Sequence, residues 1–292
     1  MRAGPHEKRT LVNHTSAHGE TEMNHNRKEK SEMADRITNE AIGTLAAALD
    51  RGKSEGLTNH LEAMARFYRY SFGNLMLIWG QREDATNVAG FREWQRKGRR
   101  VKKGEKGILI RAPFTVNKKT EVREEDKEVV IGFKPAYVFD VSQTEGDEIA
   151  GIAAVNGSPR WTVDLLKAFA STKGIEIEYD ERLAADGRAS GGLITLRPNG
   201  TPAEEFSTLV HEIAHELLHF SDEGKQISRS VAETEAEAVA YVVSTAARLD
   251  SEQASSDYIQ LYQGSSETLW ESLERVQKTA ATIIRGLEQL AA

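Results

Sequence analysis

Two histidines stand four residues apart on a segment whose sequence predicts a helix. Thr201 is followed by Pro202 and then by Glu204, which is a capping box with proline at the first helical position. Apolar residues then recur at helical spacing, so His211 and His215 lie on one face of the helix, about one turn apart. Two imidazoles in this arrangement can bind the same metal ion. The segment therefore predicts an amphipathic helix that turns its two histidines toward a cleft.

Glu212 completes a His-Glu-x-x-His pattern on this helix. At about 100° per residue it lies too far around the helix to join the histidines as a ligand. It can still reach a water molecule at the metal and act as a general base, as in zinc metallopeptidases. The chain has no cysteine, so any metal must be held by histidine or carboxylate side chains. The alternative is a core helix without metal, in which two histidines and a carboxylate would be poorly solvated.

A catalytic zinc site needs a third protein ligand and leaves the fourth position to water. The next predicted helix, about residues 230–248, carries Glu233, Glu235 and Glu237. Helical geometry places Glu235 within the apolar stripe of this helix, whereas the other two glutamates point to the opposite face. A carboxylate on a packed face is costly unless it is paired or metal-bound. We therefore expect one catalytic Zn²⁺ held by His211, His215 and Glu235, with Glu237 as the second candidate for the third ligand.

Two further polar residues near this pattern have open roles. His219 falls on the same helical face as the two histidines and could orient a ligand, or could be a half-buried residue at the helix end. Tyr241 could stabilise an oxyanion, but a packing role explains it equally simply.

The charge of the chain is unevenly distributed. The net charge is −7, yet residues 60–119 hold 14 Lys and Arg against 5 Asp and Glu. Aromatic residues are interleaved with these cations, and binding of single-stranded nucleic acid without sequence preference needs both a positive groove and exposed ring faces. The alternative is a small α+β domain with core aromatics and a solvated basic rim. The candidate DNA-binding residues are Tyr68, Tyr70, Asn74, Trp94, Arg99, Arg100, Lys102, Lys103 and Lys106.

The pattern of predicted elements indicates an α+β protein with two folded parts. We expect a disordered leader at 1–34, a DNA-binding domain at 35–145, a linker at 146–157 and a metallopeptidase-like domain at 158–292. The first domain combines helices with a small antiparallel sheet, and the second is mainly helical with a short sheet. No apolar run is long enough for a membrane span and no secretory signal is visible, so a cytoplasmic protein without a membrane partner is expected.

The chain resembles the ArdC family of antirestriction proteins. The N-terminal resemblance rests on Tyr70–Asn74, Ala85–Phe91, Trp94, Gly98–Arg99, Val101–Ile108 and, more weakly, Phe139–Thr144. The C-terminal segments Leu209–His215 and Glu233–Tyr241 look like the associated metallopeptidase domain and are also similar to ImmA/IrrE peptidases.

The resemblance implies binding of single-stranded DNA, a plasmid or other mobile-element setting and protection of incoming DNA from restriction. It also places the third zinc ligand at Glu235, with Glu212 as the base that activates water for hydrolysis of an unidentified protein substrate. Two alternatives remain. One is a DNA-binding protein that acts by occupancy and has a structural or vestigial zinc site, and the other is an ImmA-like regulator protease.

Overall fold

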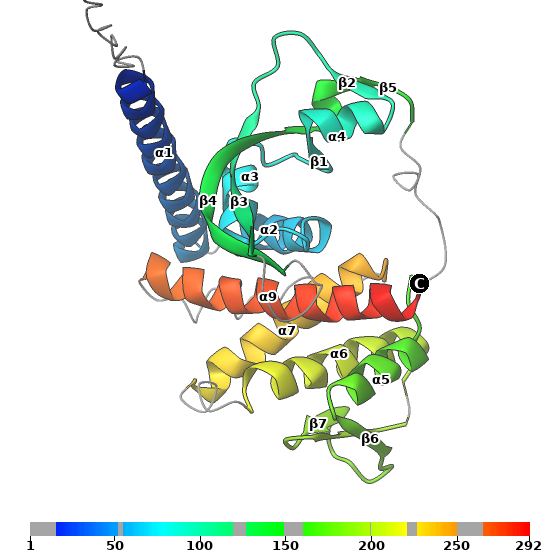
Figure 1. Cartoon of the computed structure of the whole chain (residues 1–292). Coiled ribbons are helices and arrows are strands. Elements are labelled where there is room, and N and C mark those ends of the chain that lie inside the picture. The colour runs from blue at the N-terminus through cyan, green and yellow to red at the C-terminus, as the bar shows by residue number, and fades with distance from the viewer. Residues whose placement is uncertain are drawn as a thin grey trace, which may run out of the picture. The chain divides into compact units, whose positions relative to one another are not determined.

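The computed structural model describes residues 16–51, 55–118, 127–148, 160–198, 200–220, 227–249 and 265–292 (Figure 1). The sequence prediction of an α+β fold is confirmed by the helices and short sheets of this structure. None of the helices among the described residues has the length and apolar character needed to cross a membrane. The helical elements are α1 (Ser16–Asp50), α2 (Glu55–Arg66), α3 (Phe72–Gln81), α4 (Phe91–Arg96), the 3-10 turn η1 (Val141–Gln143), α5 (Val163–Thr172), α6 (Pro202–Leu218), α7 (Arg229–Ala246) and α9 (Ser266–Leu290).

Three small sheets accompany these helices. The first has the order β1-β4-β3, the second pairs β2 with β5, and the third has the order β6-β8-β7. In the third sheet β6 runs parallel to β8, and β7 runs antiparallel to it. The strands are β1 (Val88–Gly90), β2 (Arg99–Val101), β3 (Ile108–Lys118), β4 (Lys127–Asp140), β5 (Thr144–Gly146), β6 (Glu176–Tyr179), β7 (Gly187–Ala189) and β8 (Leu193–Leu196).

The chain divides into two compact units by its internal contacts. The smaller unit comprises Met1–Arg36 and Arg111–Ala136, and the larger one Ile37–Ile110 and Tyr137–Ala292. Each of these units combines two separate segments of the chain, whereas the domains expected from the sequence are continuous ranges. Those domain boundaries stay a prediction. The expected linker at 146–157 lies outside the described residues from residue 149 onward.

In the smaller unit, α1 begins at Ser16, so residues 16–34, predicted to be a disordered leader, are helical in the structure. Ion pairs one turn apart support this polar stretch, between His25 and Glu29 at 3.2 Å and between Lys28 and Glu32 at 3.8 Å. The sequence prediction of a disordered leader did not consider these pairs.

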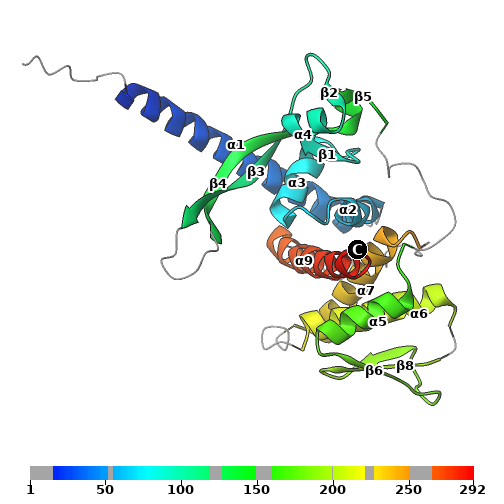
Figure 2. The ribbon, with the colours of Figure 1, turned by 45° about the vertical axis from the view of Figure 1, so that its right-hand side comes forward.

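The core of the larger unit is organised around α9 (Figures 1 and 2). This helix contacts α7, α6 and α5 as well as α2 and α3. Its apolar residues recur every three or four positions and are buried, as a helix packed on several neighbours requires. The fully buried members of this stripe are Leu269, Leu273, Val276, Ala280, Ile283, Ile284 and Leu287.

One polar junction holds β1 and β4 together at the end of their ladder. The Asp140 carboxylate accepts backbone hydrogen bonds from Thr86 at 2.8 Å, Asn87 at 3.0 Å and Ser142 at 3.0 Å. Burial alone would raise the pKa of Asp140, but these donors stabilise the charged form and hold the pKa below its ordinary value. The side chain thus caps η1 through the Ser142 amide and satisfies the amides of Thr86 and Asn87, which precede β1.

A buried histidine in α2 has no polar partner among the described residues. His60 has no exposed surface, and its ring lies edge-on to Trp79 at a centroid distance of 5.1 Å and to Phe72 at 6.0 Å. Neither ring nitrogen has a hydrogen-bond partner in the described structure. Burial therefore lowers the pKa of His60 to about 3, because the charged form would be desolvated.

We predict that His60 makes the fold acid-sensitive. The folded-state pKa lies below the unfolded value of 6.5, so its contribution to stability is complete above pH 6.5 and declines as the pH falls toward 3. At pH 5 this amounts to a loss of roughly 2 kcal/mol relative to pH 7, at 1.36 kcal/mol per pKa unit. Urea unfolding of the wild type and of His60→Leu at both pH values measures it. The variant should lose about that much less stability on acidification, and equal losses in the two proteins would contradict the prediction.

Candidate metal centre and basic surface

The helix that carries the two histidines is capped as its sequence predicts. The Thr201 hydroxyl accepts from the Glu204 amide at 3.3 Å, and the Glu204 carboxylate accepts from the Thr201 amide at 2.7 Å. Behind the histidines, the back face of α6 is fully buried against the core, with Leu209, Val210, Ile213 and Ala214 at 0% exposure. The helix is thereby held with its polar face toward a cavity.

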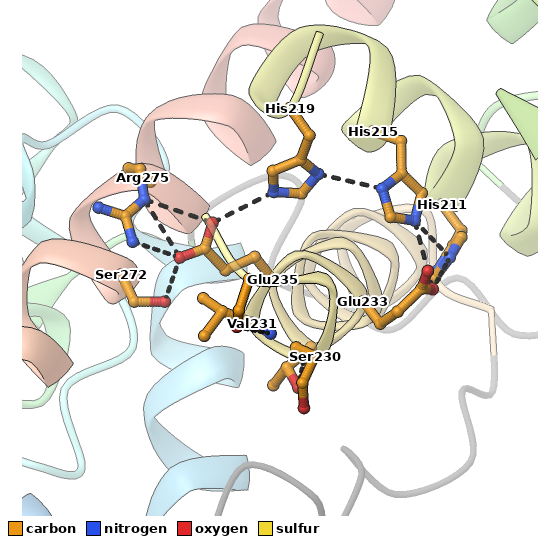
Figure 3. Close-up of polar contacts among 11 residues, drawn as sticks. His211, His215, His219, Ser230, Val231, Glu233, Glu235, Ser272 and Arg275 are labelled. Atoms are coloured by element: carbon orange, nitrogen blue, oxygen red, sulfur yellow. Dashed lines mark hydrogen bonds and ion pairs between the residues drawn. The ribbon is translucent and has the colours of Figure 1, made fainter. Parts of the chain in front are cut away.

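His211 and His215 meet a carboxylate from α7 on this polar face (Figure 3). The two Nε2 atoms are 3.1 Å apart, and Glu233 Oε2 lies 3.5 Å from His211 Nε2 and 3.4 Å from His215 Nε2. These three residues form the one group of potential metal ligands found among the described residues. In a tetrahedral site with bonds of about 2.0–2.1 Å, ligand atoms are about 3.3 Å apart, so the donor atoms and their spacing fit Zn²⁺.

Glu235, the predicted third ligand, does not join this group. Its carboxylate is fully buried on another side of α7 and points to α9 (Figure 3). Arg275 Nη2 donates to Glu235 Oε1 at 2.5 Å, and the Ser272 hydroxyl donates to the same oxygen at 2.6 Å. Glu235 was expected beside the two histidines. In the structure Glu233 lies there instead, and Glu235 is paired with an arginine.

The helical periodicity was correct about burial and wrong about what Glu235 faces. Burial by itself would raise its pKa, but hydrogen bonds from His219, Arg275 and Ser272 stabilise the charged form and keep the pKa below its ordinary value. The face that the sequence marked as solvated is the face toward the cavity, which Glu233 and Glu237 line. Glu237 is exposed and also lies outside the ligand group.

His219 closes a chain of contacts between the two sites. Its Nδ1 lies 3.0 Å from Nδ1 of His215, and its Nε2 lies 3.3 Å from Glu235 Oε2. Both descriptions left open by the sequence apply, because His219 is the half-buried C-cap of α6 and also contacts a candidate ligand.

Glu212 is buried beside the cavity, next to β7. Burial is the main cause that raises its pKa to about 7, and the nearby charges of Glu233 and Glu216 act in the same direction, whereas a hydrogen bond from the Ala189 amide opposes them. Gly187 makes this approach possible, because a Cβ at that position would lie 2.7 Å from Glu212 Oε1.

The turn after β7 is tied to the same helix. Amides of Ser190, Gly191 and Gly192 donate to the Glu216 carboxylate at 3.0, 2.8 and 2.7 Å. β7 was not predicted from the sequence, because it has only three residues and no apolar alternation.

A cavity of about 1370 Å³ opens in front of the candidate ligands. Its lining includes residues of β7, α6 and α7, among them His211, Glu212, His215 and Glu233. Tyr241 also lines it, and burial raises the pKa of its phenol, so the hydroxyl is a neutral donor. A cavity of this size is large enough for an extended stretch of peptide.

Three of the aromatic residues predicted to stack on DNA are structural. Trp94 is fully buried and its Nε1 donates to the Phe139 carbonyl at 2.8 Å. The Tyr68 hydroxyl donates to Glu288 at 2.6 Å, and the Tyr70 hydroxyl donates to the Val88 carbonyl at 3.3 Å. Trp94 and Tyr68 are buried, so a base cannot stack on their rings, whereas Tyr70 is half-buried.

The predicted polar contacts divide into engaged and exposed side chains. Arg99 donates to Thr144 Oγ1 at 2.8 Å and Arg100 to Glu145 at 2.7 Å. Asn74 is half-buried in the first turn of α3, where its amide donates to Ser71 Oγ. Lys102, Lys103 and Lys106 are exposed, and Lys102 Nζ donates to the Ser142 carbonyl at 2.9 Å.

Gln143 fixes the loop that carries these lysines. Its Nε2 donates to the Lys106 carbonyl at 2.9 Å and its carbonyl accepts from the Lys102 amide at 2.9 Å.

The structure shows a different set of rings beside this loop. Phe91 is 49% exposed and Tyr137 45% exposed, and the half-buried Phe139 lies edge-on to Phe91 at 6.5 Å. Gly107 lies beneath them, because a Cβ there would be 2.9 Å from Tyr137 Cβ. We call Phe91, Tyr137 and Phe139 the ring surface. The alternation of β4, which turns Tyr137 and Phe139 to the same face, is the signal that could have identified two of them.

The fold and the donor cluster define an α+β protein with a candidate metal centre in its C-terminal half. Its N-terminal part has known relatives, because residues 27–139 match the sequence model described as the N-terminal domain of anti-restriction factor ArdC. This part of the chain is therefore ArdC-like. The matched residues end before α5, so the family match does not extend to the candidate metal centre.

Similarity to individual proteins covers more of the chain. An uncharacterized protein of Bacillus anthracis is 25% identical over 281 aligned residues, which cover 77% of this chain and 46% of that protein. The chain thus spans about half the length of this relative. The metal-free crystal structure of the antirestriction protein ArdC from plasmid R388 has a TM-score of 0.52 and 18% identity, with 88% of this chain and 98% of that chain covered, which establishes a shared fold. The Mn(II)-bound structure of ArdC from the same plasmid aligns with a TM-score of 0.46 and 17% identity, over 78% and 97% of the chains.

Proposed function

We propose that this chain is an ArdC-like antirestriction protein that binds single-stranded DNA and hydrolyses peptide bonds at one zinc ion. The observation that carries the enzymatic part is the group of His211, His215 and Glu233 in the lining of a large cavity, with Glu212 beside it. Three protein ligands with space in front of them are typical of catalytic rather than structural zinc sites.

The ligand set that we propose is His211, His215 and Glu233. When bound there, Zn²⁺ would act as a Lewis acid and lower the pKa of water. The two imidazoles are kept neutral and ready to bind, because burial is the main cause that lowers the pKa of both, to about 4 for His215.

Glu212 is the proposed general base. Its carboxylate takes a proton from the attacking water and returns it to the leaving amine, so the same group serves as base and then as acid. A pKa near 7 makes both protonation states accessible at neutral pH. A hydrogen bond from the Ala189 amide, in β7, holds the Glu212 carboxylate in place.

The DNA-binding part is supported by the ArdC-type domain, which suggests a DNA partner, and by the ring surface beside the basic loop. Lys106 immediately precedes Gly107 under the rings, and Arg92 immediately follows Phe91; both cations are exposed. Exposed rings flanked by cations can stack unpaired bases and contact the phosphates between them. We therefore propose Phe91 and Tyr137 as stacking residues in place of the buried Tyr68 and Trp94.

A second candidate function retains the DNA interface without hydrolysis. In that case the metal would only stabilise the fold, and DNA would be protected by occupancy alone. The open cavity favours the enzymatic function, and the substitution of Glu212 separates the two.

We predict that Glu233→Ala abolishes tight zinc binding, because two histidines alone leave the ion with too few protein ligands. Metal content of the purified protein, measured after dialysis, tests this. Glu237→Ala is the matched control on the same helix and should keep one zinc per chain. Full zinc in Glu233→Ala would overturn the ligand set.

We predict that Glu212→Gln keeps the zinc and lowers peptide hydrolysis by roughly 10²- to 10⁴-fold, because the amide cannot take up a proton. The substrate can be a mixture of unstructured casein peptides, with new amino termini detected by mass spectrometry. Unchanged cleavage in the variant, or none in the wild type with full zinc, would favour the second candidate function.

We predict that the double variant Phe91→Ala/Tyr137→Ala weakens binding of a fluorescent oligothymidine by roughly 10- to 100-fold, given about 1–3 kcal/mol of stacking per base. Tyr179→Ala, which removes a similarly exposed ring in the third sheet, should have no effect. Affinity of the wild type should also fall steeply with salt, and a salt-independent signal would contradict DNA binding.

A further inference from the structure

We infer that His219, Glu235 and Arg275 form a positioning relay that orients His215 and fixes its tautomer for metal binding. The inference rests on the proposed zinc site. It assigns a role to the buried carboxylate that helical periodicity singled out and that the ligand group does not use.

Arg275 fixes which group donates and which accepts in each hydrogen bond of the relay. Its guanidinium can only donate, and Nε and Nη2 lie 3.1 and 2.5 Å from Glu235 Oε1. Ser272 Oγ lies 2.6 Å from the same oxygen. Glu235, with no exposed surface, is therefore an ionised acceptor whose second oxygen, Oε2, is directed at His219.

The charge on Glu235 dictates the tautomer of His219. A carboxylate oxygen 3.3 Å from His219 Nε2 requires a proton on that nitrogen. In the neutral ring Nδ1 then carries a lone pair and must accept. The nearest polar atom is Nδ1 of His215 at 3.0 Å, so His215 donates from Nδ1.

The tautomer of His215 leaves its other nitrogen free for a metal. With the proton on Nδ1, the Nε2 lone pair points to His211 Nε2 at 3.1 Å and Glu233 Oε2 at 3.4 Å, the ligand group itself. Hydrogen bonds of this kind to the remote nitrogen of a ligand fix its ring and raise its basicity. The relay has three residues, the C-cap of α6 and one residue each from α7 and α9.

His219 is also held by its backbone. It is the C-cap of α6, and its amide donates to the His215 carbonyl at 2.8 Å. Its side chain is only 8% exposed. The ring therefore has a fixed position between the two partners, and water has little access to replace either contact.

The first test is zinc affinity of the metal-free protein, measured by competition with a chromophoric chelator. His219→Leu removes the acceptor for His215 Nδ1, and we expect affinity to fall by roughly 10- to 100-fold with the stoichiometry unchanged at saturation. Gln277→Leu is the matched control, since Gln277 is a buried polar residue of α9 whose amide donates to the Phe67 carbonyl instead. Equal affinity of His219→Leu and the wild type would overturn the relay.

The second test begins with the wild type, so its first outcome does not depend on whether a variant folds. Long-range ¹H–¹⁵N spectra of the zinc-loaded wild type should show the proton of His215 on Nδ1 and that of His219 on Nε2. In Glu235→Gln, the amide oxygen is retained by Arg275 and Ser272, so the amide nitrogen faces His219 and should shift its proton to Nδ1. A His219 that carries its proton on Nδ1 in the wild type would refute the relay. A wild type that binds no zinc would instead refute the proposed ligand site.

Discussion

The ion pair of Glu235 and Arg275 is the constraint on which the C-terminal helices depend. A carboxylate without any exposed surface is strongly destabilising unless charge and hydrogen bonds compensate it, and removal of one partner from such a pair typically costs about 3–5 kcal/mol. Here α9 supplies the arginine and a serine, and α6 supplies a histidine. The pair therefore sets how α7 is rotated about its own axis. With Glu235 turned to α9, Glu233, two positions away, faces the two histidines of α6.

That rotation explains which parts of the site the sequence could predict. The capping box, the histidine spacing and the apolar back face are local properties, and α6 was predicted closely from them. The third ligand is not local. Periodicity identified which residues share a face of α7, but the neighbour of that face is decided by Arg275, 40 positions further along the chain. The deduction that a buried carboxylate must be paired or metal-bound was sound, and the choice between the two required the position of α9.

The basic segment illustrates a similar limit. Its composition of cations and aromatics predicted a DNA-binding region, and the match to the ArdC N-terminal domain covers this segment. Composition cannot separate rings that build the core from rings that reach solvent. Trp94 is buried and donates a hydrogen bond to β4. Tyr137 and Phe139 lie two positions apart on that strand, so they share one face and lie over Gly107. The strand register, which the sequence does not specify between distant segments, decides the difference.

The position of α9 also has a consequence for how the chain holds together. Two side chains of α9 donate to backbone carbonyls just after α2: Gln277 to Phe67, and Arg285 to Tyr68 and Arg69. Arg275 of the same helix is paired with Glu235 of α7. Residues of the ArdC-type region and the helices of the candidate metal centre thus share one hydrophobic core, with the α9 stripe as its common wall. Detachment of α9 would expose both at once, so this part of the molecule should melt in a single cooperative transition. Evolution could not exchange one of the two regions without rebuilding the helix that both use.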